Sequence, residues 1–340
     1  MTSTSASLDA RLAALQEWLA TALGRRAFSL APASTDASFR RYFRVTPADG
    51  APTLVAMDAP PPQEDCRPFV HVASLLADAG VNAPKIHAQD LDRGFLLLTD
   101  LGTTTYLQAL DAGNADALFA DALDTLVRWQ RATRANVLPP YDAALLRREL
   151  MLFPEWYLGR HRGIALDAAE SASLHAVFER IIAANLAQPA VFVHRDFMPR
   201  NLMVSAPNPG VLDFQDAVTG PITYDVASLF KDAFVSWPEE QVLDWTIRYW
   251  ERARRAGLPV KTDFGEFWRD VEWMGLQRHL KVLGIFARIC HRDGKPAYLE
   301  DTPRFLAYAR PVAERYGELA PLARLLARLD RPAHAATAGG

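Results

Sequence analysis

The chain opens with the hydrophobic pattern of an amphipathic helix. Leucines recur at three- and four-residue intervals over residues 8–23, and Gly24 follows directly. That spacing puts the leucines on one helical face, and glycine is common just past the end of a helix. We therefore predict an opening helix whose leucine face packs against the rest of the protein.

Beyond Gly24 the pattern changes to short stretches that are typical of strands. The predicted strands cover residues 27–30, 41–46, 53–57, 85–89 and 94–99. Between the third and fourth strands, residues 64–79 follow a run of prolines and have helical spacing. The buried stripe predicted for this helix is formed by Phe69, Val72, Leu75 and Leu76. This order indicates a small antiparallel sheet with one major helix.

From residue 101 onward helical patterning dominates, and one β-like island interrupts it at residues 191–214. The longest predicted helix covers residues 267–288. On that helix the polar side chains of Gln277, Lys281 and Arg288 share one face.

The change of pattern predicts an α+β fold with two lobes. A nucleotide-binding sheet lobe covers residues 1–100, with a hinge at residues 98–101. A helical lobe for catalysis and acceptor binding covers residues 101–330. The small and polar residues of the tail, 331–340, predict disorder.

Composition narrows the class of protein. The 340 residues are 50% hydrophobic and 23% charged, which suits two lobes that each bury a core. The formal net charge of -3 gives no general attraction for nucleic acid. No segment has the pattern of a signal peptide or of a membrane span. Cys66 and Cys290 lie far apart, without zinc-ligand spacing. We expect a cytoplasmic protein without nucleic-acid, membrane or obligate protein partners.

The β-like island carries the candidate chemistry. It reads VFVHRDFMPRNLMVSAPNPGVLDFQD over residues 191–216, with a Pro/Asn/Gly turn between two short strands, 202–204 and 211–212. Asn201 stands just before the first strand and Asp213 just after the second. An antiparallel hairpin would bring these two side chains together at its open end. Their amide and carboxylate oxygens suit a magnesium ion that also binds phosphate.

Asp196 lies five residues before Asn201 on the adjoining loop. A single Asp or Asn in a loop is most often a turn or cap residue. The joint pattern, HRDFMPRN followed by DF, is instead that of a kinase, with a catalytic base and two metal ligands. We interpret Asp196 as the base, Asn201 and Asp213 as magnesium ligands, and ATP as the phosphate donor. His194 is interpreted as bracing this loop through hydrogen bonds.

A resemblance to a known family adds to this interpretation. The segment GPITYDVA, at residues 220–227, resembles the matching segment of aminoglycoside phosphotransferase-like kinases. The segments SFRRYFRV, VAMDAPP, GFLLLTDLG and KVLGIFAR are similar to the anomeric N-acetylmuramate/N-acetylglucosamine kinases of bacterial cell-wall recycling. The resemblance covers nearly the whole chain. It implies a protein-kinase-like fold of the aminoglycoside phosphotransferase type.

The resemblance also implies a reaction. It suggests that the protein phosphorylates the anomeric hydroxyl of N-acetylmuramate or N-acetylglucosamine, giving an α-1-phosphate for peptidoglycan recycling. It further implies that Asp225 tethers the catalytic loop, a role compatible with capping the helix that begins there. The motifs themselves indicate phosphate transfer, and the resemblance alone names the sugar.

The nucleotide side departs from the usual kinase pattern. Residues 34–41, STDASFRR, lack the glycines that usually cover the phosphates, although Ala37 and Ser38 are small enough to expose backbone N–H groups. The third strand places Met57 where a phosphate-anchoring lysine is expected. A thioether cannot offset phosphate charge, so another cation must do so.

Arginines of the second strand are the nearest substitutes for that lysine. Strand alternation puts Arg40 and Arg44 on one face and Arg41 on the other. We rank Arg40 and Arg44 first, with solvated edge charges as the alternative. Asp100, at the hinge, joins these cofactor-binding candidates.

Candidate substrate contacts are spread along the second lobe. Arg200 and Asp216 flank the proposed catalytic groups, and Glu155 follows an interruption of helical patterning. Trp273 offers a flat surface to a sugar ring, and Lys281 offers a cation to a lactyl carboxylate. For each of them an ordinary structural role, as a loop charge or a core anchor, is the alternative.

Two other functions fit the same residues. One is a kinase for another small alcohol, such as an aminoglycoside, choline or homoserine. The other is a nucleotide-binding pseudokinase, which Met57 and the glycine-free loop favour and the pair Asp196 and Asp213 opposes.

Replacement of the proposed base tests the catalytic interpretation. Asp196→Asn is expected to lower turnover by orders of magnitude, because the amide cannot accept the acceptor's proton, while nucleotide binding is nearly unchanged. Steady-state kinetics and nucleotide titration measure the two effects separately. Turnover at the wild-type level in this variant would contradict the assignment.

Overall fold

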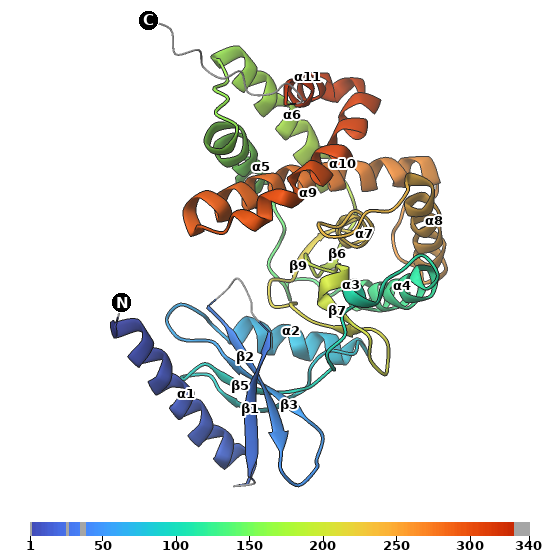
Figure 1. Cartoon of the computed structure of the whole chain (residues 1–340). Helices are drawn as coiled ribbons and strands as arrows, with labels where there is room; N and C mark the ends of the chain where they lie inside the picture. Colours follow the sequence, from blue (N-terminus) through green and yellow to red (C-terminus); the bar gives the residue numbers. More distant parts are fainter. Residues whose placement is uncertain (1, 25–26, 35–38, 330–340) are drawn as a thin grey trace, which may run out of the picture. The chain divides into compact units, whose positions relative to one another are not determined.

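The computed structural model describes residues 2–24, 27–34 and 39–329. The chain divides into two units by internal contacts, one formed by residues 1–109 with 201–216 and the other by 110–200 with 217–340. Figure 1 shows the whole chain coloured along its sequence. The predicted tail, 331–340, and the small residues Ala37 and Ser38 lie outside the described part. The lobe boundaries expected from the sequence remain a prediction.

The first unit is built on a five-stranded antiparallel sheet with the strand order β1-β2-β3-β5-β4. Its strands are β1 (Phe28–Ser34), β2 (Arg41–Pro47), β3 (Leu54–Asp58), β4 (Ile86–Asp90) and β5 (Phe95–Thr99). All five predicted strands are thereby confirmed. β1 runs further than predicted, to Ser34, because an edge strand tolerates Pro32.

Helix α1 (Thr2–Ala22) covers one face of this sheet (Figure 1). Leu15, Trp18 and Leu19 are buried against apolar side chains of the strands. The sheet side of this core is formed by Val45, Ala56, Phe95 and Leu97. Because side chains alternate along a strand, the neighbours of these residues in β2 and β3 face the other side of the sheet.

A buried carboxylate ties α1 to the sheet. The side chain of Asp58, at the end of β3, is fully buried and accepts hydrogen bonds from Arg11 of α1 and Arg41 of β2. Arg11 also donates to the carbonyl oxygen of Arg93, at 2.9 Å. Breaking a buried ion pair by removing one partner is strongly destabilising, so this cluster fixes the helix as well as the strand.

Helix α2 (Arg67–Asp78) begins three residues later than predicted. The Asp65 carboxylate accepts a hydrogen bond from the backbone N–H of Arg67 at 2.9 Å, and Pro68 occupies the first turn. Proline belongs in the first turn of a helix because its missing N–H is not needed there. The predicted buried stripe of this helix is confirmed.

A short hairpin from much later in the chain completes the first unit. Its strands are β7 (Leu202–Met203) and β8 (Gly210–Val211), preceded by the 3-10 turn η2 (Pro199–Asn201). The backbone N–H of Val211 donates to the carbonyl oxygen of Asn82 at 2.7 Å, and the Asn82 amide donates to Ser205 Oγ at 3.1 Å. These bonds join the hairpin to the loop that follows α2.

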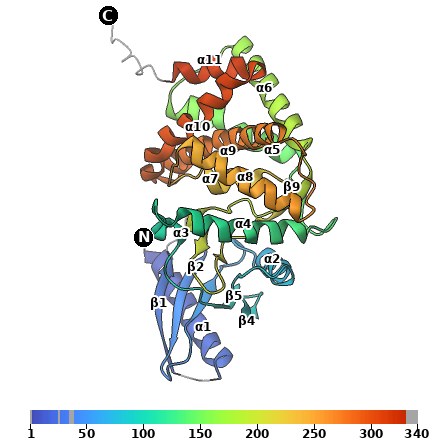
Figure 2. The same ribbon diagram turned by 90° about the vertical axis from the view of Figure 1, so that its right-hand side faces the viewer.

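The second unit is helical. Its main helices are α4 (Ala115–Arg131), α5 (Ala143–Leu150), α6 (Ala168–Leu186), α7 (Tyr224–Phe230), α8 (Glu239–Arg255), α9 (Phe264–Asp293), α10 (Thr302–Arg315) and α11 (Ala320–Arg328). Helix α9 lies at its centre, in contact with α5, α6, α7, α8 and α10 (Figures 1 and 2). A two-stranded sheet is formed by β6 (Ala190–Val193) and β9 (Val218–Pro221), and β6 leads into the loop of residues 194–198, the candidate catalytic loop.

Helix α9 is longer than the predicted 267–288. The Asp263 carboxylate caps its first turn by accepting from the N–H of Glu266 at 2.9 Å, and Gly294 ends it in a left-handed conformation. Before it in the chain, residues 153–161 form the π-helix η1 (Phe153–His161), where the sequence shows an interruption at Pro154. Among the described helices, none combines the length and apolar character needed to cross a bilayer.

The turn between β4 and β5 depends on a glycine. Gly94 has φ +72°, and a Cβ atom there would lie 1.9 Å from the carbonyl oxygen of Ala59. The backbones meet here because the N–H of Ala59 donates to the carbonyl oxygen of Gly94, at 2.8 Å. Gly80 has a similar φ of +69° but has open space around the same position.

These two glycines separate backbone strain from steric overlap. Gly80→Ala should lower the free energy of unfolding by about 1–2 kcal/mol, the left-handed penalty. Gly94→Ala should lower it by about 1–3 kcal/mol more, because the backbone of Ala59, just after β3, must also move. Chemical denaturation of both variants measures the difference. Equal losses in the two variants would show that the close approach at Ala59 contributes nothing.

Candidate active site

The hairpin brings Asn201 and Asp213 together. The backbone N–H of Leu212 donates to the carbonyl oxygen of Asn201 at 2.9 Å, which closes the open end of the hairpin. The side-chain amide of Asn201 lies 3.3 Å from Asp213 Oδ2, and Gln215 donates to Asp213 Oδ1 at 2.9 Å. Asp213 has φ +62°, an uncommon conformation that local hydrogen bonds hold. The contact is made by the amide nitrogen Nδ2 of Asn201, so an amide side chain and a carboxylate lie next to each other at the open end of the hairpin.

Asp225, in the first turn of α7, holds the backbone of the catalytic loop. Its carboxylate oxygens accept hydrogen bonds from the N–H groups of His194, at 2.7 Å, and Arg195, at 3.0 Å. Burial raises the pKa of Asp225 to about 7, while these two N–H donors oppose the rise. The Asp225 side chain is fully enclosed, so the loop backbone is fastened from inside the helical unit.

His194 braces the same loop. Its ring nitrogen Nδ1 accepts a hydrogen bond from the backbone N–H of Asp196, at 3.2 Å. The ring is buried and lies edge-on to Phe197. This hydrogen bond orients the backbone of Asp196, and the bracing role expected for His194 stays a prediction. Asp196 itself is half-buried.

On the nucleotide side, both candidate arginines have acidic partners within the first unit. Arg40 Nε donates to Glu64 Oε2 at 3.1 Å. Arg44 Nε donates to Asp100 Oδ2 at 2.6 Å, and its Nη2 donates to the carbonyl oxygen of Gly102 at 3.0 Å. Burial tends to raise the pKa of Asp100, but Arg44 and other donors bring it below the usual value.

Strand register places these arginines relative to Met57. Tyr42 of β2 lies directly opposite Met57 of β3, and the Met57 side chain is buried. Tyr42 also makes a side-chain hydrogen bond with Arg40, so both belong to the same face of the sheet as Met57. Arg41 faces the other way and binds Asp58.

The five substrate candidates differ in exposure. Arg200, Asp216 and Glu155 are exposed, and the guanidinium of Arg200 lies 4.9 Å from the ring centre of Phe234. Trp273 is buried in the helical core, edge-on to Tyr316. Lys281 is also buried, and its ammonium binds Glu149 and the Tyr224 hydroxyl.

Glu149 is a residue that the sequence analysis did not single out. It lies in α5, within a run of leucines and arginines that reads as an ordinary amphipathic helix. In the folded protein its carboxylate binds Arg195, which immediately precedes Asp196. No short-range motif signals this contact, because 46 positions separate the two residues.

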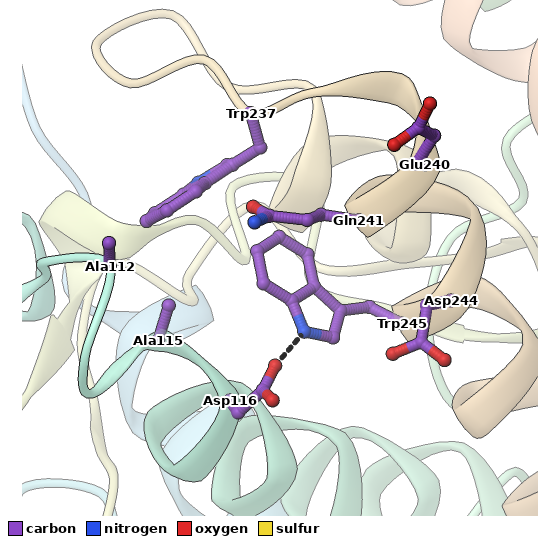
Figure 3. A pocket seen from close by; sticks show the side chains of 8 residues that line it. All are labelled: Ala112, Ala115, Asp116, Trp237, Glu240, Gln241, Asp244 and Trp245. Atoms are coloured by element: carbon purple, nitrogen blue, oxygen red, sulfur yellow. Dashed lines mark hydrogen bonds between the residues drawn. The ribbon is translucent and has the colours of Figure 1, made fainter.

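A surface hollow in the second unit contains none of the predicted site residues (Figure 3). It is lined by Ala112, Ala115, Asp116, Trp237, Glu240, Gln241, Asp244 and Trp245. The Trp245 indole N–H donates to Asp116 Oδ1 at 2.6 Å across its floor. Its carboxylates and indoles make this hollow acidic and aromatic.

Comparison with known proteins decides the family. The sequence profile of the APH phosphotransferase enzyme family matches residues 29–260. The chain belongs to this family. The prediction of a small-molecule kinase, a phosphotransferase acting on an alcohol group, is thereby confirmed. The resemblance on which that prediction drew is confirmed as well.

Curated relatives match over most of their length. The N-acetylmuramate/N-acetylglucosamine kinase of Pseudomonas putida is 60% identical over 307 residues, which cover 90% of each chain. The kinase of the same name from Pseudomonas aeruginosa is 60% identical over 306 residues, again 90% of each chain. The one from Neisseria meningitidis serogroup B is 49% identical over 319 residues, 93% of this chain and 95% of the relative.

Solved structures confirm the predicted fold. The choline kinase LicA from Streptococcus pneumoniae aligns with a TM-score of 0.61 and 15% identity, covering 87% of this chain and 97% of its own. The ADP-bound aminoglycoside phosphotransferase APH(2'')-Ib aligns with a TM-score of 0.59 and 14% identity, with the same coverage. The protein therefore has the protein-kinase-like, aminoglycoside phosphotransferase type of fold.

Proposed function

We propose that the protein is an ATP-dependent sugar kinase that phosphorylates the anomeric hydroxyl of N-acetylmuramate and N-acetylglucosamine. The observation that carries this proposal is the match to kinases named for these two sugars, at 60% identity over 90% of the chain. The product would be the α-1-phosphate, formed in the cytoplasm for peptidoglycan recycling. The sugar's C1 oxygen bonds to the γ-phosphorus of ATP, the bond to the bridging oxygen breaks, and ADP leaves.

Asp196 is the proposed base of this reaction. Its carboxylate orients the C1 hydroxyl and takes up the proton that the hydroxyl loses on phosphate transfer. An anomeric hydroxyl is more acidic than other sugar hydroxyls, so an ordinary carboxylate suffices. The loop that carries Asp196 is fastened through His194 and Asp225.

Asn201 and Asp213 would hold magnesium. Asn201 Nδ2 lies 3.3 Å from Asp213 Oδ2 at the end of the hairpin, so the two side chains are adjacent. The amide oxygen of Asn201 and the carboxylate of Asp213 are the hard oxygen ligands that this ion prefers. When bound, the ion neutralises charge on the phosphates. The protein's own contribution is to keep the two donors adjacent, which the hydrogen bond from Leu212 N–H to Asn201 secures.

For the nucleotide phosphates we propose Arg40 as the substitute for the missing lysine. In kinases that lysine pairs with a glutamate of the lobe's major helix. Here Glu64, just before α2, binds Arg40 at 3.1 Å, and both side chains keep 15% of their surface exposed. Arg44 is bound by Asp100 and Gly102 instead, which favours a structural role beside the hinge.

The substrate contacts expected from the sequence stay proposals. Exposure favours direct sugar contact for Arg200, Asp216 and Glu155. Burial favours supporting roles for Trp273 and Lys281. An arginine near the catalytic loop suits the lactyl carboxylate of N-acetylmuramate.

An acceptor panel tests the proposed function. Incubation with ATP, magnesium and either amino sugar should consume ATP and give a product one phosphate heavier, with the anomeric NMR signal of an α-1-phosphate. Aminoglycosides, choline and homoserine serve as comparison acceptors in the same assay. Phosphorylation of one of these in place of both sugars would assign the protein to another branch of the family.

A charge relocation tests the role of Arg40. Arg40→Gln should weaken ATP binding, measured without sugar, by on the order of tenfold or more, because a charge-assisted contact to phosphate is lost. Adding Met57→Lys to that variant should recover much of the affinity, since Glu64 can then orient the new ammonium. Arg67→Gln, at an exposed pair with Asp65, is the control and should leave affinity unchanged.

Two outcomes would count against this assignment. ATP affinity that is unaffected by Arg40→Gln would remove Arg40 from the phosphate site. A large loss in Arg44→Gln, with none in Arg40→Gln, would transfer the role to Arg44.

A further inference from the structure

A single buried carboxylate collects the polar contacts behind the catalytic loop. Glu149 of α5 is only 6% exposed. Its four side-chain donors are Arg195 Nη2 at 2.8 Å, Lys281 Nζ at 3.0 Å, Gln277 Nε2 at 3.1 Å and the Tyr141 hydroxyl. Burial acts to raise the pKa of Glu149, but Lys281 and Arg195 outweigh it and lower the pKa. The carboxylate is therefore ionised at neutral pH.

The two cations around Glu149 have different neighbours. Lys281 also donates to the Tyr224 hydroxyl, at 3.1 Å, and so has a second acceptor within the helical core. Arg195 belongs to the loop itself and is directly followed by Asp196. A change at Glu149 can therefore act on the core through Lys281 or on the loop through Arg195.

The backbone of Arg195 is strained. Its φ is +77°, in the left-handed region that a residue with a side chain seldom adopts. Such conformations persist only where the surroundings enforce them, and they gather at functional sites. Among the contacts of Arg195, one holds its backbone and one holds its guanidinium. Its N–H donates to Asp225 at 3.0 Å, and its guanidinium binds Glu149 at 2.8 Å.

We propose that Glu149 is a positioning residue for phosphate transfer: by binding the Arg195 guanidinium, it maintains the left-handed backbone that sets the direction of the Asp196 side chain. The inference rests on the role of Asp196 proposed above. Asp225 holds the backbone at the start of the loop by accepting from its N–H groups, and Glu149 holds the side chain of Arg195. Without the second anchor, the φ of Arg195 can relax toward an ordinary value and carry Asp196 with it.

Two substitutions of Arg195 test this mechanism while Glu149 keeps its other partners. Arg195→Ala removes the anchor but keeps the left-handed penalty, and kcat should fall by about 10–100-fold, as misplaced catalytic groups usually cause. Arg195→Gly also removes the anchor but adopts the same φ without strain. Its kcat should fall several-fold less than that of the alanine variant, with the KM for ATP unchanged in both.

A double-mutant cycle identifies the route by which Glu149 acts. Glu149→Gln in the wild-type background should reduce kcat about as much as Arg195→Ala, on the order of 10–100-fold. In the Arg195→Gly background, the same change should add little, because there is no guanidinium to hold. Glu179→Gln is the matched control, since Glu179 of α6 pairs on the surface with Arg147 of α5, the helix that carries Glu149, at 2.7 Å.

Amide hydrogen exchange provides a readout that needs no acceptor. Glu149→Gln should speed exchange within residues 194–198, and the Arg195→Gly background should largely remove that effect. If the wild-type protein phosphorylates neither amino sugar, the proposed function fails while this measurement still tests the anchor. Kinetics are then taken with whichever acceptor the panel identifies.

Three results would overturn the proposal. In the first, the alanine and glycine variants at position 195 have the same kcat. In the second, Glu149→Gln has equal effects in both backgrounds, which would mean that Glu149 acts through Lys281 or general stability. In the third, Glu149→Gln leaves kcat and loop exchange at wild-type values. Should that variant fail to fold, the comparison of alanine with glycine at Arg195 decides alone.

Discussion

The buried carboxylate of Asp225 is the constraint on which the loop of residues 194–198, the proposed catalytic loop, depends. It accepts from two consecutive backbone N–H groups, and this fixes two peptide planes at once. These two peptide planes set the direction of the chain that follows. His194 Nδ1 can therefore accept a hydrogen bond from the N–H of Asp196. Because the carboxylate has no exposed surface, water does not compete for these bonds. The same burial opposes ionisation of the carboxyl group and raises its pKa.

In both units, ion pairs between a carboxylate and arginine or lysine side chains connect separate segments of the chain. On one face of the first sheet, Asp58 joins Arg11 and Arg41, and on the other face Glu64 and Asp100 each take one arginine. In the second unit Glu149 binds one cation from the catalytic loop and one from α9. A buried charge without a partner is strongly unfavourable. These pairs therefore specify which segments meet, in addition to stabilising the fold.

Local chemistry could be predicted from the sequence, and distant pairing could not. Asn201 and Asp213 are only twelve positions apart, and a turn with two short strands lies between them. Their proximity could therefore be predicted from the sequence. The partner of Arg44 lies 56 positions away, and that of Arg195 lies 46 positions away. Nothing in the sequence near Glu149 distinguishes it from a surface charge of an amphipathic helix. What distinguishes Glu149 is its burial among Arg195 and Lys281, and that burial arises only when the helices assemble.

The ends of the family match have a consequence for where this protein can be shortened. The match covers residues 29–260, whereas Arg11 and Lys281 lie outside it on either side. Arg11 is one of two arginines that compensate Asp58, and Lys281 is one of two cations that compensate Glu149. A fragment trimmed to the matched region would lack α1 and α9, and each carboxylate would lose one of these two cations. We therefore expect a stable version of this kinase to need more of the chain than the region by which its family is identified.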